Sequence, residues 1–141
     1  KMVNAVANSV VPKFTIITGN SYGAGNYAMC GKAYDPRLIV SWPWAELAVM
    51  GGTQAAKVLV QIQESSLKKQ GKRISEEEHK QLMEKITQNY TKQTKSEYSA
   101  ARIWVDAIIN PLDTRKWIST GIEAANHSPI TDKFNLGIIQ V

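Results

Sequence analysis

Residues 13–31 read KFTIITGNSYGAGNYAMCG, and this stretch decides the fold. Its first part, residues 14–18, is apolar and rich in β-branched side chains, which predicts a short buried strand. The strand breaks at Gly19, and small residues then lead into a helix predicted over residues 23–30. Where a strand turns through small residues into a helix, backbone N–H groups are exposed and can hold an oxyanion or a phosphate. This turn is therefore the first place to look for chemistry.

The composition is that of a folded domain. Hydrophobic residues make up 43% of the 141 residues and charged residues 21%, which is ample for a packed core. No apolar run approaches the roughly 20 residues that span a bilayer, so we expect no membrane association. The single cysteine, Cys30, cannot form an internal disulfide, which favours a reducing compartment. Because the sequence starts at Lys1 inside an apolar-periodic segment, we expect a piece of a longer protein.

The net charge of +5 could indicate an anionic partner. Much of the positive charge, however, is spread over residues 57–95, a helical region that also carries glutamates. Since no basic stripe with interleaved aromatic residues is present, we do not expect a nucleic-acid partner. A mildly basic surface that attracts acidic coenzymes or acidic partner subunits fits the charge equally well.

The rest of the chain alternates short apolar runs with helical patterns. The apolar runs at 38–42, 47–50 and 105–109 favour strands or extended segments, and helical spacing predicts helices at 2–11, 96–104 and 112–125. Asn110 at the cap, followed by Pro111 at the first helical position, would start the last of these helices. A helix opens at Gly51-Gly52, with Ala55, Ala56, Leu59, Val60 and Ile62 on its expected buried side. A capping box at residues 75–78 opens the next helix. We expect one α/β or α+β domain with a projecting helical hairpin at about 53–94.

Residues 19–23, GNSYG, match the G-x-S-x-G pattern of a nucleophile elbow. Asp106 or Asp113, followed by His127, would complete the chain order of an α/β serine hydrolase that uses Ser21. The pattern also arises easily by chance, since it fixes three positions of common small residues. In the simpler interpretation, the Ser21 hydroxyl satisfies the backbone of its own turn.

Other side-chain sites lack their patterns. The glycines at 23 and 25 are not followed by the third glycine of a dinucleotide fingerprint, and no triphosphate-binding Gly-Lys-Ser/Thr follows. Two isolated histidines and one cysteine have no metal-ligand spacing, so we expect no metal. What remains is the backbone, because small residues at 23–25 let a carbonyl group approach the main chain closely. Gly51-Gly52 places small residues at the next helix start in the same way. Tight packing of the backbone would explain the small residues at both helix starts equally well.

Longer motifs resemble one family, the carboxyltransferase (beta) subunits of biotin-dependent acyl-CoA carboxylases. The branch that they resemble most is methylcrotonyl-CoA carboxylase. The motifs that carry the resemblance are residues 17–31, Trp42-Pro43 with Ala45, residues 48–52 with 54–56, residues 98–104, Asp106, residues 108–109, Pro111, residues 113–115, and Phe134 with Gly137-Ile138. The resemblance covers nearly the whole chain and is weakest from 64 to 95.

The resemblance implies a crotonase-like ββα superhelix. The full subunit would hold two such domains, and residues 1–141 would be the latter part of the C-terminal carboxyltransferase domain. The implied function is transfer of CO2 from carboxybiotin to the α or γ carbon of an acyl-CoA, with methylcrotonyl-CoA favoured and a propionyl- or acetyl-CoA type as the alternative. Because the cofactor supplies the base, no catalytic side chain is needed.

The implied partners are a biotin carboxylase/biotin carrier (alpha) subunit and further copies of the same subunit. The N-domain of a neighbouring copy would hold the thioester carbonyl, so the fragment alone would be inactive. The implied location is the bacterial cytoplasm, or the mitochondrial matrix in a eukaryote.

The resemblance also assigns site residues. The oxyanion hole falls on the backbone N–H groups of Ala24 and Gly25, which would face biotin, and Gly23 would let the turn close. Removing one such donor typically costs on the order of 3 kcal/mol of barrier.

The acyl pocket is assigned next to this turn. Tyr27 lies about one helical turn beyond it and favours a larger branched or unsaturated acyl group. Val49, Met50 and Gly51 would form the wall beside Tyr27.

Overall fold

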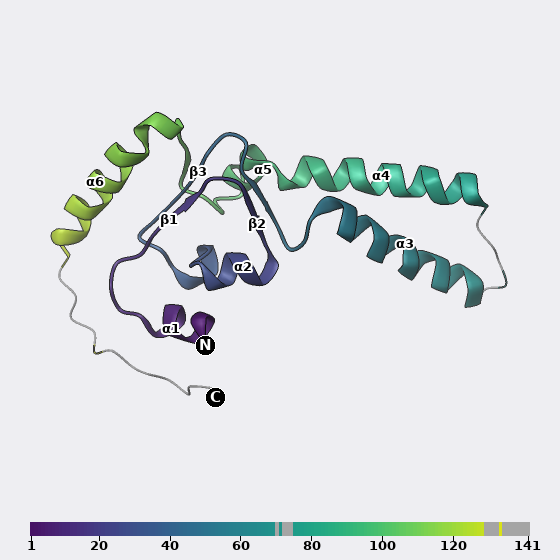
Figure 1. Cartoon of the computed structure of the whole chain (residues 1–141), viewed down its shortest axis with the longest axis horizontal. Helices are drawn as coiled ribbons and strands as arrows, with labels where there is room; N and C mark the ends of the chain where they lie inside the picture. The colour runs from purple at the N-terminus through teal and green to yellow at the C-terminus, as the bar shows by residue number, and fades with distance from the viewer. Residues whose placement is uncertain (70, 72–74, 129–132, 134–141) are drawn as a thin grey trace.

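The structure is a computed structural model that describes residues 1–69, 71, 75–128 and 133. The closing motif with Phe134 and Gly137 lies outside the described residues. Short strands and the helix α2 (Gly23–Ala28) form the centre, and a helical hairpin and the helix α6 (Thr114–Asn126) extend from it in different directions (Figure 1).

The N-terminal part confirms the predicted order and adds one strand. It runs from α1 (Met2–Asn8) through β1 (Phe14–Ile17) to α2, as expected from the apolar pattern. Between β1 and α2, however, lies a further strand, β2 (Asn20–Tyr22), where the sequence predicts only a turn. Asparagine and serine have little preference for strands, so this strand depends on its pairing partner rather than on its own residues.

All strand pairs within the two sheets are parallel. In one sheet β3 (Leu38–Ser41) lies between β1 and β5 (Ala107–Ile108), and in the other β2 pairs with β4 (Glu46–Ala48). Two backbone hydrogen bonds continue the strand pairing where the chain passes from the first sheet to the second. The Trp42 N–H donates to the Ile17 carbonyl at 2.9 Å, and the Glu46 N–H donates to the Gly19 carbonyl at 3.2 Å. The α/β alternative is therefore confirmed, with parallel pairing.

The core lies where the two sheets meet. It is formed by Ile17, Ile39, Ala45, Leu47 and Val105. Beneath it, the short helix α5 (Ser96–Ala100) contributes the fully buried Ser96, whose Oγ lies 2.9 Å from the Trp42 carbonyl oxygen and 2.8 Å from that of Ala45. The single hydroxyl hydrogen of Ser96 can donate to one of these carbonyls at a time, and the Trp42 carbonyl also accepts from the Ala45 N–H at 3.0 Å. Both carbonyls of the loop that leads into β4 therefore have a donor within reach, and a buried carbonyl without one would be costly.

The projecting hairpin consists of α3 (Gly52–Lys69) and α4 (Glu76–Thr94), which pack along each other (Figure 1). The capping box of α4 is confirmed: the Ser75 Oγ accepts from the Glu78 N–H at 3.2 Å, and the Ser75 N–H donates to the Glu78 carboxylate at 2.9 Å.

The buried side of α3 is narrower than the sequence predicts. Ala55, Ala56 and Val60 are buried, whereas Leu59 and Ile62 are 44% and 60% exposed. The prediction was wrong for these two residues because the part of α3 that projects packs along one helix only, so a single narrow stripe of its surface is covered.

The C-terminal part differs in detail from the predicted helices. α5 stops at Ala100 because Ile103 adopts a left-handed backbone with φ 60°, and the Trp104 N–H returns to the Ser99 carbonyl at 2.9 Å. This bond pattern is a Schellman helix end.

The last helix begins as predicted, with Asn110 accepting from the Leu112 N–H at 3.0 Å. Its first turn, Pro111–Asp113, is a 3-10 turn that leads into α6, and another 3-10 turn, Lys32–Tyr34, follows α2. No helix in the described part of the chain is both long and apolar enough to span a membrane.

Candidate functional site

The turn into α2 requires a glycine at position 23. Gly23 has φ 50°, a conformation that side-chain-bearing residues rarely adopt. A Cβ at this position would also lie 2.8 Å from the carbonyl oxygen of Val49. The main chain at the start of α2 therefore touches the segment after β4, and only glycine permits this approach.

The first turn of α2 leaves backbone donors without an acceptor inside the helix. Tyr22 occupies the N-cap position but makes no side-chain capping bond. Ala24 and Gly25 are exposed, and a Cβ on Gly25 would meet nothing within 4 Å. The first turn of α2 is therefore open to solvent at these two residues.

Side chains around the turn hold α2 in place. The Asn26 Nδ2 donates to the Ser21 Oγ at 2.9 Å, which ties the first turn of α2 to β2. The Asn26 carbonyl accepts from the Gly31 N–H at 2.8 Å at the other end of the helix. A Cβ on Gly31 would lie 1.9 Å from the Asn26 Oδ1, so the Asn26 side chain fills the space beside this glycine.

A pocket of about 280 Å³ opens beside the turn. Its lining residues are Gly23, Asn26, Tyr27, Lys32, Ala33, Leu47, Ala48, Val49 and Trp104. The structure thus brings together Gly23, Tyr27 and Val49 among the predicted residues. Met50 is not among the residues that line this pocket, and Gly51 lines a different, polar pocket of about 380 Å³ together with Tyr22 and Glu46.

Sequence reasoning did not find Lys32 and Trp104 as pocket residues. The Lys32 Nζ pairs with Asp106 Oδ1 at 3.2 Å, and Asp106 Oδ2 accepts from the Ile39 N–H at 2.8 Å. Lys32 and Asp106 are far apart in the sequence, and only the parallel pairing of β3 and β5 brings them together. No local pattern could have indicated this pair.

Tyr22 and Glu46 form a second polar contact near the turn. The Tyr22 hydroxyl donates to the Glu46 Oε2 across the β2–β4 pair. Burial, followed by the hydrogen bond to Glu46 and its charge, raises the pKa of Tyr22 to about 12. Tyr22 therefore stays protonated and keeps its hydroxyl as a donor at neutral pH.

The residues of the hydrolase alternative do not form a triad. Ser21 lies within β2, opposite Leu47, rather than at a strand-to-helix elbow, and its Oγ accepts from Asn26. Asp106 is engaged by Lys32 and Ile39. Asp113 lies at the start of α6, and His127 follows the opposite end of that helix, which lies away from β2 (Figure 1). In the described residues, no group of three histidine, cysteine or acidic side chains is placed to hold a metal ion.

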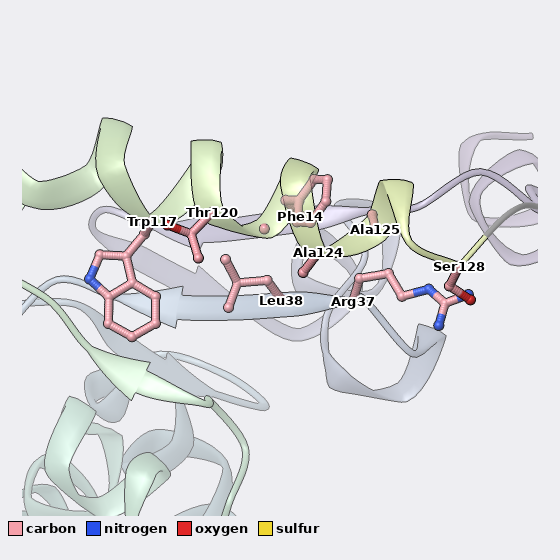
Figure 2. Close-up of a pocket in the computed structure, with 9 residues that line it drawn as sticks. Phe14, Arg37, Leu38, Trp117, Thr120, Ala124, Ala125 and Ser128 are labelled. Atoms are coloured by element: carbon pink, nitrogen blue, oxygen red, sulfur yellow. The ribbon is translucent and has the colours of Figure 1, made fainter.

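A second apolar pocket, of about 370 Å³, lies between α6 and the edge of β1 and β3. Figure 2 shows Trp117 at one end and Arg37 with Ser128 at the other, with Phe14 and Leu38 between them. The helix comes close here because position 121 is a glycine, whose Cβ would lie 2.9 Å from the Phe14 ring. Arg37 is the charged residue among those that line this pocket, and most of the others are apolar or small.

Comparison with known proteins assigns the family. A family model described as "Carboxyl transferase domain" matches residues 1–136. The chain is 48% identical over 137 residues to a probable mitochondrial methylcrotonoyl-CoA carboxylase beta chain of Drosophila melanogaster, covering 96% of this chain and 24% of that protein. It is also 48% identical over 132 residues to the corresponding mitochondrial beta chain of Arabidopsis thaliana, covering 94% and 22%.

Solved structures agree. The beta subunit of Pseudomonas aeruginosa geranyl-CoA carboxylase matches with a TM-score of 0.77 at 37% identity, covering 95% of this chain and 25% of that one. A chain of the transcarboxylase 12S crystal structure matches with a TM-score of 0.76 at 27% identity, covering 95% of this chain and 24% of that one. The chain thus spans about a quarter of the length of the relatives it matches. The chain belongs to the carboxyl transferase domain family.

Proposed function

We propose that this chain is part of the carboxyltransferase component of a biotin-dependent acyl-CoA carboxylase, with a methylcrotonyl-CoA-like substrate favoured. The observation that carries the proposal is the family match over residues 1–136, which includes every residue of the pocket beside the α2 turn. Relatives at 48% identity are named methylcrotonoyl-CoA carboxylase beta chains, which supports the choice of acyl group.

The chain would be the latter part of a C-terminal carboxyltransferase domain with the crotonase-like ββα fold. Two features support this assignment. The strands pair in parallel, and the match to a geranyl-CoA carboxylase beta subunit extends over 95% of the chain. A single partial domain with a helical hairpin is consistent with both.

The α2 turn suits the ureido oxygen of biotin. Gly25 has open space where a side chain would be, and the amides of Ala24 and Gly25 are exposed at a helix start without a side-chain cap. Biotin, when bound, supplies the carboxyl group and the base. The protein's contribution is to hold negative charge on an oxygen with two fixed N–H donors, while Gly23 lets the turn approach Val49.

The neighbouring pocket suits the acyl group. Tyr27, Val49 and Trp104 give it apolar walls, and about 280 Å³ is smaller than an ordinary site for a drug-sized ligand. It has room for a branched acyl end but not for coenzyme A, which would lie outside it. Met50 and Gly51 continue the same segment toward the hairpin, and we retain them as part of the proposed wall.

The missing half of the site would come from partners. We propose that the N-domain of a neighbouring subunit holds the thioester carbonyl, and that a biotin carboxylase/biotin carrier (alpha) subunit delivers biotin. The relatives from D. melanogaster and A. thaliana are named as mitochondrial. We therefore propose the mitochondrial matrix as the location in a eukaryote and the cytoplasm in a bacterium.

The test is bicarbonate fixation by the full-length subunit with its biotin-carrying partner, across propionyl-, methylcrotonyl- and geranyl-CoA. We expect methylcrotonyl-CoA to give the highest kcat/KM. Gly25→Pro removes an oxyanion N–H and should lower kcat by 10²-fold or more. Ser21→Ala should have a mild effect. Covalent labelling of Ser21 by a fluorophosphonate, with no carboxylation of any acyl-CoA, would contradict the proposal.

A further inference from the structure

We propose that Glu46, acting through the Tyr22 hydroxyl, is a positioning residue for the backbone amides of Ala24 and Gly25. This inference rests on the proposed function, because it assigns those amides to an oxyanion. Neither Tyr22 nor Glu46 would touch the substrate. Their role would be to fix the direction of the strand end from which the amides project.

The hydrogen bond joins two neighbouring strands diagonally. Tyr22 is opposite Ala48 in the β2–β4 register, and Glu46 is opposite Asn20, so Tyr22 and Glu46 lie on the same face of the pair. Side chains in such diagonal positions are within reach of one another when one of them is long. The Tyr22–Glu46 bond therefore ties the carboxyl end of β2 to the first residue of β4, and so fixes the direction of β2 where it enters α2.

The amides follow directly from this strand end. Tyr22 is the last residue of β2 and the N-cap of α2, so Ala24 and Gly25 come only two and three residues later. α2 has six residues and no side-chain cap, and β2 has three residues. A helix and a strand this short have little stability of their own, so contacts with neighbouring elements must set their orientation.

The two faces of β2 are held by different contacts. Ser21 points to the face where its Oγ accepts from Asn26 of α2, at 2.9 Å. Tyr22 alternates to the other face, where its ring lies 3.7 Å from a Cβ built on Gly51 and its hydroxyl reaches Glu46. Removing the second contact would leave the strand end held on one face only.

The charge of Glu46 strengthens this bond. A carboxylate acceptor gives a shorter and stronger hydrogen bond than a neutral one. Burial, together with the bond and the negative charge of Glu46, raises the pKa of Tyr22 to about 12, and its hydroxyl is a donor at neutral pH. Glu46 also forms a backbone bridge with Lys95, at the junction of α4 and α5, so the bond connects the turn to the base of the hairpin.

The test compares Tyr22→Phe, Glu46→Ala, Glu46→Gln and the Tyr22→Phe/Glu46→Ala double variant in the full-length subunit with its partner. We expect Tyr22→Phe and Glu46→Ala each to lower kcat about tenfold, since a hydrogen bond to a charged group is worth about that factor. KM for acyl-CoA should not change, because the amides face biotin. The double variant should lose no more than either single variant, and Glu46→Gln, which keeps an acceptor, should retain most of the activity.

Tyr90→Phe is the matched control, because it removes a tyrosine hydroxyl from α4, outside the turn and its pocket. A second readout does not need activity: hydrogen exchange at the Met29 and Gly31 amides, which donate to the Gly25 and Asn26 carbonyls of α2, should accelerate in Tyr22→Phe and not in Tyr90→Phe. Unchanged exchange with unchanged kcat, or losses that add in the double variant, would overturn the inference. Faster exchange in a protein that carboxylates no acyl-CoA would overturn the proposed function but support the Tyr22–Glu46 contact.

Discussion

Two glycine-led helix starts look alike in the sequence and differ in the structure. At α2, Gly23 has φ 50° and a Cβ there would lie 2.8 Å from the Val49 carbonyl oxygen. At α3, a Cβ on Gly51 would lie 3.7 Å from the Tyr22 ring, and one on Gly52 would lie 3.5 Å from Thr91 Oγ1. Those are ordinary contact distances, so the α3 start tolerates a side chain and the α2 start does not.

The difference separates a packing corner from a candidate site. The α2 start requires glycine for both its backbone conformation and its space, and its first amides are exposed. The α3 start lies at the base of the hairpin, between Tyr22 and the last turns of α4. Glycine spacing alone therefore does not identify an anion site. What matters is whether the backbone, rather than a side chain, makes the close approach.

Among variants at the two helix starts, Gly23→Ala should lower the free energy of unfolding the most. The left-handed backbone alone costs about 1–2 kcal/mol with a Cβ, and the contact with the Val49 carbonyl adds to it. We expect a loss of at least about 2 kcal/mol in the free energy of unfolding, together with loss of the proposed carboxyltransferase activity of the full-length subunit. Denaturant unfolding of the variant beside Gly51→Ala measures the difference. Equal stability of the two variants would show that the two starts are equivalent.

The sequence predicted the α2 turn well because its signals are local. Apolar β-branched residues at 14–18 and small residues at 23–25 reveal a strand and a tight turn without reference to any other part of the chain. The capping box at Ser75 and the Asn110 cap were predicted for the same reason, since both partners of each cap lie within a few residues.

The features that were missed depend on distant partners. β2 consists of Asn20, Ser21 and Tyr22, which by themselves predict a loop, and it exists because β4 pairs with it. Lys32 reaches the rim of the pocket and Asp106 because β3 and β5 are parallel neighbours. The exposure of Ile62 depends on how many helices cover α3, and the apolar periodicity of the α3 sequence does not indicate that number.

Gly52→Ala should change the free energy of unfolding by less than Gly23→Ala does, and in the opposite direction. Alanine at a position whose backbone it can adopt reduces the entropy of the unfolded chain, and we expect a gain of about 0.5 kcal/mol in the free energy of unfolding. The contact of 3.5 Å with Thr91 Oγ1 needs no rearrangement. Carboxylation by the full-length subunit should not change. A loss of activity without a loss of stability would place the α3 start in the site as well.

We expect the smallest effect from changing the cap at the start of α4, a helix start at which we propose no site. Ser75 and Glu78 satisfy its first amides, whereas no side chain caps α2. The backbone and side-chain hydrogen bonds from Ser75 lower the pKa of Glu78 from its ordinary 4.5. Because the folded pKa is the lower one, this stabilisation is present above about pH 4.5 and is lost as the pH falls through the folded value.

Acid titration followed by helical circular dichroism should therefore show a small loss of signal below pH 4.5 that Glu78→Gln removes. The start of α2 should give no such titration, because its first turn carries no acidic residue and no side-chain cap. If Glu78→Gln left the acid transition unchanged, the hairpin would be held by its helix–helix contacts and not by its cap. Capping would then cease to distinguish the start of α4 from the start of α2, where we propose the oxyanion site.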